Sequence, residues 1–199
     1  MDHFQHKAKD YEKNQRRVEN VNRIANGMLE HIAFEKQMNI VDFGSGTGLL
    51  LERIAPHVNS ITAIDTSRAM NEQLRAKLDT INCEVQIIEK DLVTHQLENT
   101  YDGLISSMTM HHVENIENMF KRFYELIKPG GFIAIADLEQ EDGSFHSDGT
   151  TGVHHHGFQL DELTQRVTET GFKTVKTSIV STINKHGNEY AVFLLSATR

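Results

Sequence analysis

The chain has 199 residues and carries 28 acidic against 20 basic side chains, a formal net charge of −8. This length is enough for one domain with a substantial core. The acidic balance argues against a nucleic acid as the main partner, because phosphate binding requires a basic surface. A single cysteine, Cys83, excludes an intrachain disulfide, and no apolar run is long enough to span a membrane. We therefore expect a cytoplasmic protein with no membrane or nucleic-acid partner.

Residues 7–33 have the pattern of an amphipathic helix, with a break expected near Gly27. The apolar stripe recurs at intervals of three and four residues and consists of Val18, Val21, Ala25, Met28 and Ile32. We interpret residues 1–33 as a helical cap or lid over a binding pocket, with Tyr11 or Arg16 as contacts. The alternative is a solvated helix that packs only through its later turns.

A glycine-rich segment follows the first predicted strand, residues 39–43. Gly44, Gly46 and Gly48 stand at alternate positions, and a helical pattern begins near Thr47. Glycine has no Cβ, so the backbone can turn tightly and approach a ligand closely. The free N–H groups at a helix start favour anionic or polar ligand atoms. The segment is typical of a cofactor-binding loop.

The glycine spacing indicates the kind of cofactor. The dinucleotide fingerprint G-x-G-x-x-G would place its third glycine at position 49, where this chain has Leu49. Asp42 stands two residues before Gly44, and a carboxylate there suits a cationic ligand and repels a pyrophosphate. We therefore predict a ligand with an amino group or a sulfonium and no diphosphate, which makes a nicotinamide oxidoreductase improbable.

Strand and helix patterns alternate through the rest of the chain, which predicts parallel strands joined by helices. Further strands are expected at 60–65, 84–91, 101–108 and 126–137, and helices at 47–56, 67–79, 115–127 and 159–170. The helix at 115–127 should stop before Pro129, with Gly130 and Gly131 as the turn. Residues 174–183 and 189–197 are rich in β-forming residues around a short turn, which predicts a hairpin and one antiparallel strand.

Five of these segments resemble the ordered motifs of the class I S-adenosylmethionine-dependent methyltransferases. Residues 41–48, Val-Asp-Phe-Gly-Ser-Gly-Thr-Gly, resemble the first motif, and Asp65 and Asp91 end the next two strands. Residues 101–108 and 126–137 resemble the fourth and fifth strand motifs. The resemblance implies an α/β, Rossmann-like seven-stranded mixed sheet in the order 3-2-1-4-5-7-6, with strand 7 antiparallel and helices on both faces. Residues 1–199 would then form a single methyltransferase domain.

The same resemblance implies the cofactor, S-adenosyl-L-methionine, and its product, S-adenosyl-L-homocysteine. Asp65 would accept hydrogen bonds from the ribose hydroxyls, and Asp91 would face the adenine amino group. An acid after a strand is also a common helix N-cap, so Asp91 has a purely structural alternative. The implied cofactor contacts are Asp42, Gly44, Ser45, Gly46, Gly48, Asp65, Thr66, Met70, Asp91, Leu92 and Ser106.

The methyl acceptor should enter between the loops after the fourth and fifth strands. His111 and His112 follow the fourth strand, and we expect one to point into the pocket and the other to pack under the next helix. The long segment 137–157 contains the run His154, His155 and His156. We select His111, His112 and His155 as candidate general bases. The alternatives are structural histidines or a polar loop; the run has none of the common helical metal spacings, and we predict no metal.

The preferred function is therefore methyl transfer to an O, N or S atom of a small molecule by in-line displacement. A nucleic-acid or protein methyltransferase is a second hypothesis, although residues 106–109 lack the Asn/Asp-Pro-Pro-Tyr motif and no Pro-Cys pair is present. A third is a non-catalytic S-adenosylmethionine-binding protein. We expect the small-molecule acceptor to be selected by residues 1–17 and 139–157, in a monomer or a homodimer.

Overall fold

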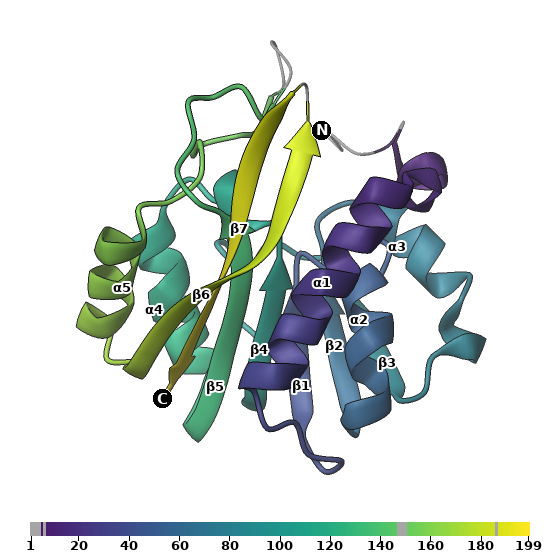
Figure 1. Ribbon diagram of the computed structural model, residues 1–199. Coiled ribbons are helices and arrows are strands. Elements are labelled where there is room, and N and C mark those ends of the chain that lie inside the picture. Colours follow the sequence, from purple (N-terminus) through teal and green to yellow (C-terminus); the bar gives the residue numbers. More distant parts are fainter. Residues whose placement is uncertain (1–4, 6, 147–150, 186) are drawn as a thin grey trace.

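A computed structural model describes residues 5, 7–146, 151–185 and 187–199. Seven strands form one sheet in the order β3-β2-β1-β4-β5-β7-β6 (Figure 1). Strands β1 to β5 are parallel, and β7 runs antiparallel to both β5 and β6. The predicted strand order is confirmed. The strands are β1 (Asn39–Phe43), β2 (Ser60–Ile64), β3 (Glu84–Ile88), β4 (Tyr101–Ser107), β5 (Ile127–Leu138), β6 (Lys173–Lys185) and β7 (Asn188–Thr198).

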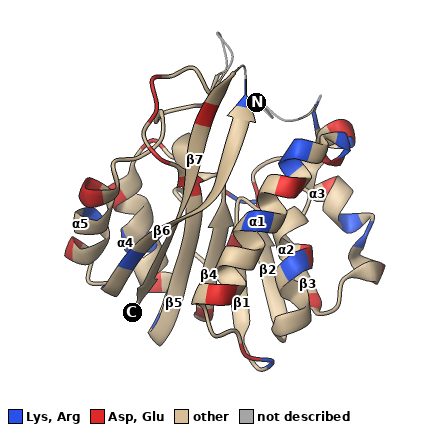
Figure 2. Ribbon diagram, viewed as in Figure 1, with Lys and Arg blue, Asp and Glu red and all other residues tan. Residues whose placement is uncertain are grey.

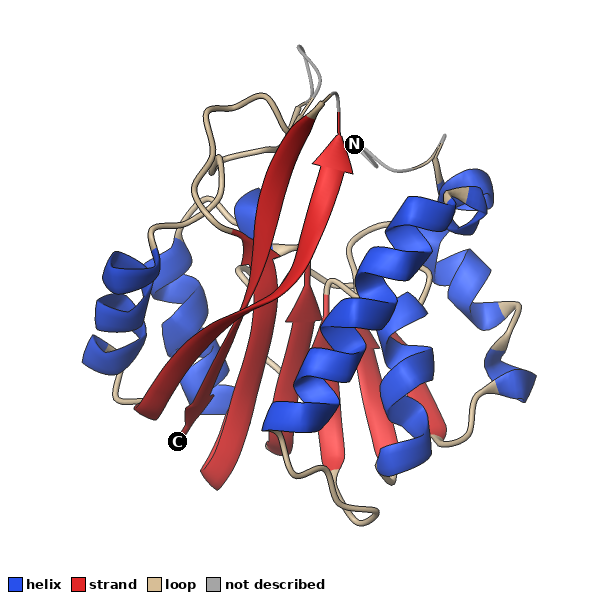
Figure 3. Ribbon diagram, in the orientation of Figure 1, coloured by secondary structure: helices blue, strands red, loops and turns tan. Residues whose placement is uncertain are grey.

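Helices cover both faces of the sheet (Figure 3). On one face α4 and α5 contribute Phe123 and Val167 to a core with Leu104 of β4. On the other face α1 and α2 contribute Met28 and Leu51 to a second core. The α-helices are α1 (Gln15–His31), α2 (Leu49–Ile54), α3 (Arg68–Arg75), α4 (Ile116–Leu126) and α5 (Leu160–Glu169). In the described part of the chain, no helix is long and apolar enough to cross a bilayer.

The expected break of the first helix at Gly27 is wrong. The interruption lies at Asn14, between a 3₁₀ helix (Ala8–Lys13) and α1, where the Asn14 side chain accepts a hydrogen bond from the backbone N–H of Arg17. Gly27 continues the helix because α1 lies against β6 there: a Cβ on Gly27 would stand 2.6 Å from Cγ1 of Val180. The glycine marks a close contact between two elements and not a helix end.

The boundaries at both ends of the hairpin and of β5 also differ from expectation. Strand β5 starts at Ile127, directly after α4, so Gly130 and Gly131 lie within a strand whose pairing with β4 shifts register there. Strands β6 and β7 pair as far as Lys185 with Asn188, beyond the predicted 174–183 and 189–197. The longer hairpin extends past the carboxyl ends of the parallel strands (Figure 1).

Candidate active site

A cleft of about 810 Å³ opens at the carboxyl ends of β1 and β4, the edge at which open α/β sheets bind ligands. The glycine-rich loop forms one wall, and the start of α1 with the preceding 3₁₀ helix forms another. Three further parts complete the lining of the cleft. They are the loop after β4, the residues Phe145, His146 and Thr151 between β5 and α5, and the end of β6. Its volume is near the upper end of the usual range for ligand pockets, about 300–1,000 Å³.

The glycine-rich loop is held in a conformation that side chains disfavour. Gly44, Gly46 and Gly48 have φ of +71°, +54° and +87°. A Cβ on Gly46 would meet nothing within 4 Å, whereas one on Gly44 would stand 2.2 Å from the Thr109 side chain. Asp65 at the end of β2 accepts hydrogen bonds from the backbone N–H of Gly46 at 2.8 Å and of Ser67 at 2.7 Å. Asp65 thus holds in place the glycine-rich loop, which lines the cleft.

Asp42 at the end of β1 is 1% exposed and lines the cleft. Its Oδ2 atom has no hydrogen-bond partner within the described residues. Burial, and after it the charge of Asp65, raises the pKa of Asp42 to about 8. The carboxyl group therefore carries a proton at neutral pH and ionises when a cation is placed beside it.

His111, which lines the cleft, forms a buried pair with Asp137. Asp137, the next-to-last residue of β5, is fully buried, and its Oδ1 atom lies 2.7 Å from Nδ1 of His111. It also accepts hydrogen bonds from the backbone N–H groups of His111 and Leu138. An acceptor at Nδ1 fixes the tautomer of His111 with its proton on that atom. Nε2 is then the basic nitrogen of a histidine that lines the cleft.

Two more imidazoles stand beside His111. The ring centroid of His112 lies 4.1 Å and that of His146 5.0 Å from the His111 centroid. Burial and the neighbouring His111 lower the pKa of His112, and burial followed by His111 and His112 lowers the pKa of His146 to about 4. Both His111 and His112 line the cleft, so the expectation that one would pack elsewhere is wrong. Within the described ranges, no three His, Cys, Asp or Glu side chains are placed to hold a metal ion.

Several of the predicted contacts do not form the cleft wall. Ser106 is buried and donates to the carbonyl of Phe43 at 2.8 Å. The Asp91 carboxylate accepts from the N–H of Val93 at 2.8 Å in a turn; no helix follows it among the described residues, so the helix-capping alternative is not what the structure shows. The remaining residues outside the lining of this cleft are Gly48, Thr66, Met70, Leu92 and the partly exposed Asp65, which holds the glycine loop.

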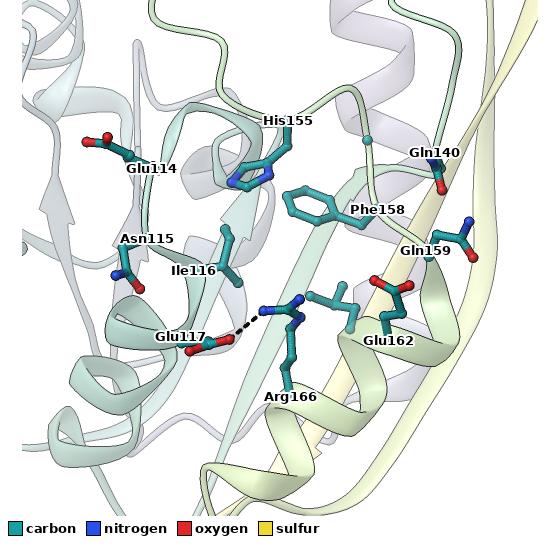
Figure 4. A pocket seen from close by; sticks show the side chains of 12 residues that line it. Glu114, Asn115, Ile116, Glu117, Gln140, His155, Phe158, Gln159, Glu162 and Arg166 are labelled. Atoms are coloured by element: carbon teal, nitrogen blue, oxygen red, sulfur yellow. Dashed lines mark hydrogen bonds and ion pairs between the residues drawn. The ribbon is translucent and has the colours of Figure 1, made fainter.

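His155 is not brought to the cleft either. It lies in a separate pocket of about 380 Å³ between the starts of α4 and α5, where it points toward Phe158 (Figure 4). Its Nε2 atom donates to the carbonyl of Val113 at 2.9 Å. The backbone N–H groups of His154 and His155 bond the carbonyl of His111, so the run of histidines fixes the loop beneath the His111 ring.

Sequence reasoning missed part of the wall. Asn20 of α1, Ser107, Phe145, His146 and Lys185 all line the cleft and were not selected as site residues. Asn20 has a detectable signal, because it is a polar residue beside the apolar stripe of α1. Lys185 has none, because its position depends on how far the β6–β7 hairpin extends.

Six buried polar atoms in the cleft wall have no hydrogen-bond partner within the described part of the chain. They are Asn20 Oδ1, Asp42 Oδ2, Ser45 Oγ, Thr47 Oγ1, Ser107 Oγ and His146 Nε2. A buried polar group without a partner costs about 1–3 kcal/mol, so their concentration in one cleft indicates a polar ligand. A molecule that carries an amino group, a carboxylate and hydroxyls fits this set of donors and acceptors.

The sequence matches the methyltransferase-domain family over residues 8–177. The chain belongs to this family. The class I S-adenosylmethionine-dependent type expected from the motifs is confirmed. An uncharacterized methyltransferase of Schizosaccharomyces pombe is 29% identical over 135 residues, 60% of this chain and 48% of the relative. One of Mycobacterium bovis is 30% identical over 97 residues, 48% of each chain. The chain thus spans about half the length of these curated relatives.

Solved structures share the fold. A chain in the complex between the Haloferax volcanii Trm112 methyltransferase activator and a methyltransferase superposes with a TM-score of 0.80 at 14% identity, over 100% of this chain and 98% of that one. Haemonchus contortus phosphoethanolamine N-methyltransferase 2, in complex with S-adenosyl-L-methionine, gives a TM-score of 0.70 at 12% identity, over 96% and 59%. At these identities the likeness concerns the fold alone.

Proposed function

We propose that this methyltransferase transfers the methyl group of S-adenosyl-L-methionine to an O, N or S atom of a small molecule. The observation that carries the proposal is the pairing of two features in one cleft. The glycine-rich loop and Asp42 line the cleft, and so does His111, which the buried Asp137 orients. A cofactor loop and an oriented base that share one cavity are the parts that such a transfer requires.

The cofactor end of the cleft is assigned to Asp42, Ser45, Gly46 and Asn20, with Asp65 holding the loop. Asp42 would pair with the amino group, and the unpartnered Ser45 and Asn20 oxygens would meet polar atoms of the ligand. Asp65 already holds Gly46 and Ser67, and because a carboxylate has about four acceptor positions it can also accept from hydroxyl groups. When bound, S-adenosyl-L-methionine supplies a methyl group already activated by its sulfonium.

The remaining work of the chain is to hold the acceptor in line and to remove its proton. Positioning of two reactants can contribute about 7–11 kcal/mol. The Nε2 atom of His111 is the proton acceptor for a hydroxyl, thiol or ammonium acceptor, and Asp137 stabilises the imidazolium that results. The start of α1, Phe145 and the end of β6 line the same cavity. This enclosure favours a small acceptor over a protein or a nucleic acid.

Binding and turnover test the proposal in sequence. Calorimetric titration of S-adenosyl-L-homocysteine into the wild type should give micromolar affinity, and NADH should not bind. Asp65→Ala should weaken this binding strongly, because the loop loses its anchor. Turnover is then followed as release of S-adenosyl-L-homocysteine with a panel of small hydroxyl, amine and thiol acceptors. Binding of NADH in place of S-adenosyl-L-homocysteine would refute the proposal, and binding without turnover of any acceptor would favour the non-catalytic alternative.

A further inference from the structure

The cleft has a charge opposite to that of the whole protein. Its lining includes Lys7, Arg16, Arg17 and Lys185, against the single carboxyl group of Asp42. No carboxylate among the described residues lies within 4.0 Å of the charged groups of these four side chains. In a chain with a net charge of −8, a cavity lined by unneutralised cations is a feature to be explained. It indicates ligands that bring negative charge.

These cations divide between the two ends of the cleft. The Arg17 guanidinium lies 3.9 Å from the Tyr11 ring centroid and donates to the Tyr11 carbonyl at 2.6 Å. Tyr11 is close enough to Asp65 for their charges to interact, which places Arg17 at the cofactor end. Lys185 lies on the histidine side, because it packs on Phe145, whose ring lies 5.0 Å from that of His146, and the His146 ring lies 5.0 Å from that of His111.

Lys185 is held in place by packing and not by an opposite charge. Its Nζ atom lies 4.7 Å from the ring centroid of Phe145 and donates to the Phe145 carbonyl. The Phe145 ring packs edge-on against Tyr190 of β7 at 5.1 Å, and the Tyr190 hydroxyl contacts Ser144 Oγ at 2.7 Å. The loop and the hairpin therefore hold the cation at a defined position before any ligand arrives.

The surroundings of Lys185 leave its charge uncompensated. The nearby Glu141 carboxylate accepts hydrogen bonds from the backbone N–H groups of Gly143 and Phe145, and its ion pair is with His156. The cleft also contains three imidazoles, which supply no negative charge to balance Lys185. They belong to His111, His112 and His146. The Nε2 atom of His146 is buried and has no partner within the described residues. The Lys185 ammonium and the N–H of a neutral imidazole at His146 Nε2 would together suit an oxyanion that accepts from both.

We infer that the methyl acceptor is a small anionic molecule, whose carboxylate or phosphate group is bound by Lys185 while its nucleophilic atom lies at His111. The inference rests on the proposed function and deepens it by naming the class of acceptor. Lys185 acts as a specificity residue: it touches the substrate but takes no part in proton transfer. The separation of Lys185 from the cofactor end keeps its charge available to the second ligand.

The test uses the full chain saturated with S-adenosyl-L-homocysteine and matched pairs of probes. 4-Hydroxybenzoate is compared with 4-hydroxybenzamide, and O-phosphoserine with serine, by calorimetric titration. We expect the anionic member of at least one pair to bind about tenfold or more tightly than its neutral partner. Lys185→Gln should abolish that preference and leave the affinity for the neutral member and for S-adenosyl-L-homocysteine unchanged. Lys185→Arg should restore most of the preference.

Lys176→Gln is the matched control, because Lys176 is an exposed residue of the same strand outside the cleft. It should behave as the wild type. Equal or absent binding of both members of every pair would overturn the inference, as would a Lys185→Gln variant that keeps the preference. If the wild type does not bind S-adenosyl-L-homocysteine, the proposed function itself fails and the inference fails with it. The cofactor titration therefore separates the two failures.

Discussion

The residue that most sharply reports the state of the cleft is Asp42. Its carboxyl group is buried beside Asp65, and one of its oxygens has no hydrogen-bond partner among the described residues. The glycine motif alone indicates that a carboxylate stands at this position. It does not indicate that the group is protonated, because the pKa depends on burial by α1 and by the loops that close over the strand ends. Electrostatics of this kind require the three-dimensional arrangement.

The pH dependence of stability should reveal Asp42. Its pKa is about 8 in the native state against the ordinary aspartate value of 3.8, so between these values the native state binds more protons than the unfolded state. Stability of the ligand-free protein should therefore fall as the pH rises from about 4 to about 8, by up to about 1.4 kcal/mol per pH unit, and level off above. Asp42→Asn should remove this contribution. Urea unfolding of both proteins from pH 5 to 9 measures the difference, and Asp79→Asn, at an exposed site, should retain the wild-type slope.

Variants of the proposed catalytic pair, His111 and Asp137, should separate turnover from cofactor binding. His111→Gln should lower kcat by about 10²-fold or more, the usual contribution of a general base, with unchanged affinity for S-adenosyl-L-homocysteine. Asp137→Asn should also lower kcat, since the amide releases the tautomer of His111. Steady-state kinetics and calorimetry measure the two quantities. His57→Gln, outside the cleft, serves as control, and an unchanged kcat in His111→Gln would contradict the assigned role.

At the scale of elements, the walls of the cleft come from two sources. The loops after the parallel strands form one part, and the helix α1 and the β6–β7 hairpin form the rest. Figure 2 shows basic and acidic positions alternating along α1, which packs beside β6. Arg23 donates to Ser181 at 2.8 Å, and Gly27 meets Val180. A lid role for residues 1–33 remains a prediction, supported by the cleft-lining positions of Tyr11, Arg16 and Arg17.

The α1–β6 contact should be sensitive to one methyl group. Gly27→Ala places a Cβ 2.6 Å from Cγ1 and 2.9 Å from Cβ of Val180, a stiff side chain that cannot swing away. The clash should cost about 1–3 kcal/mol, partly offset by about 1 kcal/mol of helix propensity. Denaturant unfolding should show a net loss of stability. In a Val180→Ala background the same change should become neutral or stabilising, and Asn26→Ala, at the exposed neighbouring position, should not destabilise.

Local sequence patterns predict well which helices and strands are present. They predict poorly where each element ends and which distant residues it contacts. The strand ends at Asp42 and Asp65 follow from apolar runs that stop at an acid, and the resemblance to known motifs supplies the strand order. The break assigned to Gly27 fails because a helical glycine can serve packing as well as termination. His155 fails for a related reason: its role is set by the carbonyl of Val113, a partner 42 residues away that no local pattern identifies.

The whole molecule couples ligand binding to stability through the unsatisfied atoms of its cleft. Six buried polar atoms in the cleft wall have no hydrogen-bond partner among the described residues. Only two such atoms, Asn71 Oδ1 and Glu141 Oε1, belong to described residues outside the cleft wall. The unpartnered atoms of the cleft lower the stability of the free protein, and a ligand that satisfies them should stabilise the entire fold. The charge distribution is also a property of the whole molecule, because the protein has a net charge of −8 while basic side chains line its cleft.

Thermal unfolding should report this coupling directly. S-adenosyl-L-homocysteine at 100 times its Kd should stabilise the fold by about 2.7 kcal/mol. For a domain of this size that raises Tm by about 5–10 °C. Differential scanning calorimetry with NADH as the control ligand measures the shift. A comparable shift with NADH, or none with S-adenosyl-L-homocysteine, would contradict the assignment of the cleft.

The bond from Arg23 to Ser181 spans 158 residues of sequence, and it links the first helix to the last strand pair. During synthesis on the ribosome, α1 emerges long before the strand against which it packs has been translated. Lys185 is translated later still. A nascent chain that already contains the glycine-rich loop therefore lacks the β6 residues that line the cleft. Full affinity for either ligand should thus appear only after the hairpin has been released from the exit tunnel. Ligand binding in the cleft should therefore follow translation of the β6–β7 hairpin, and ligands cannot template the early folding of α1 and the glycine-rich loop.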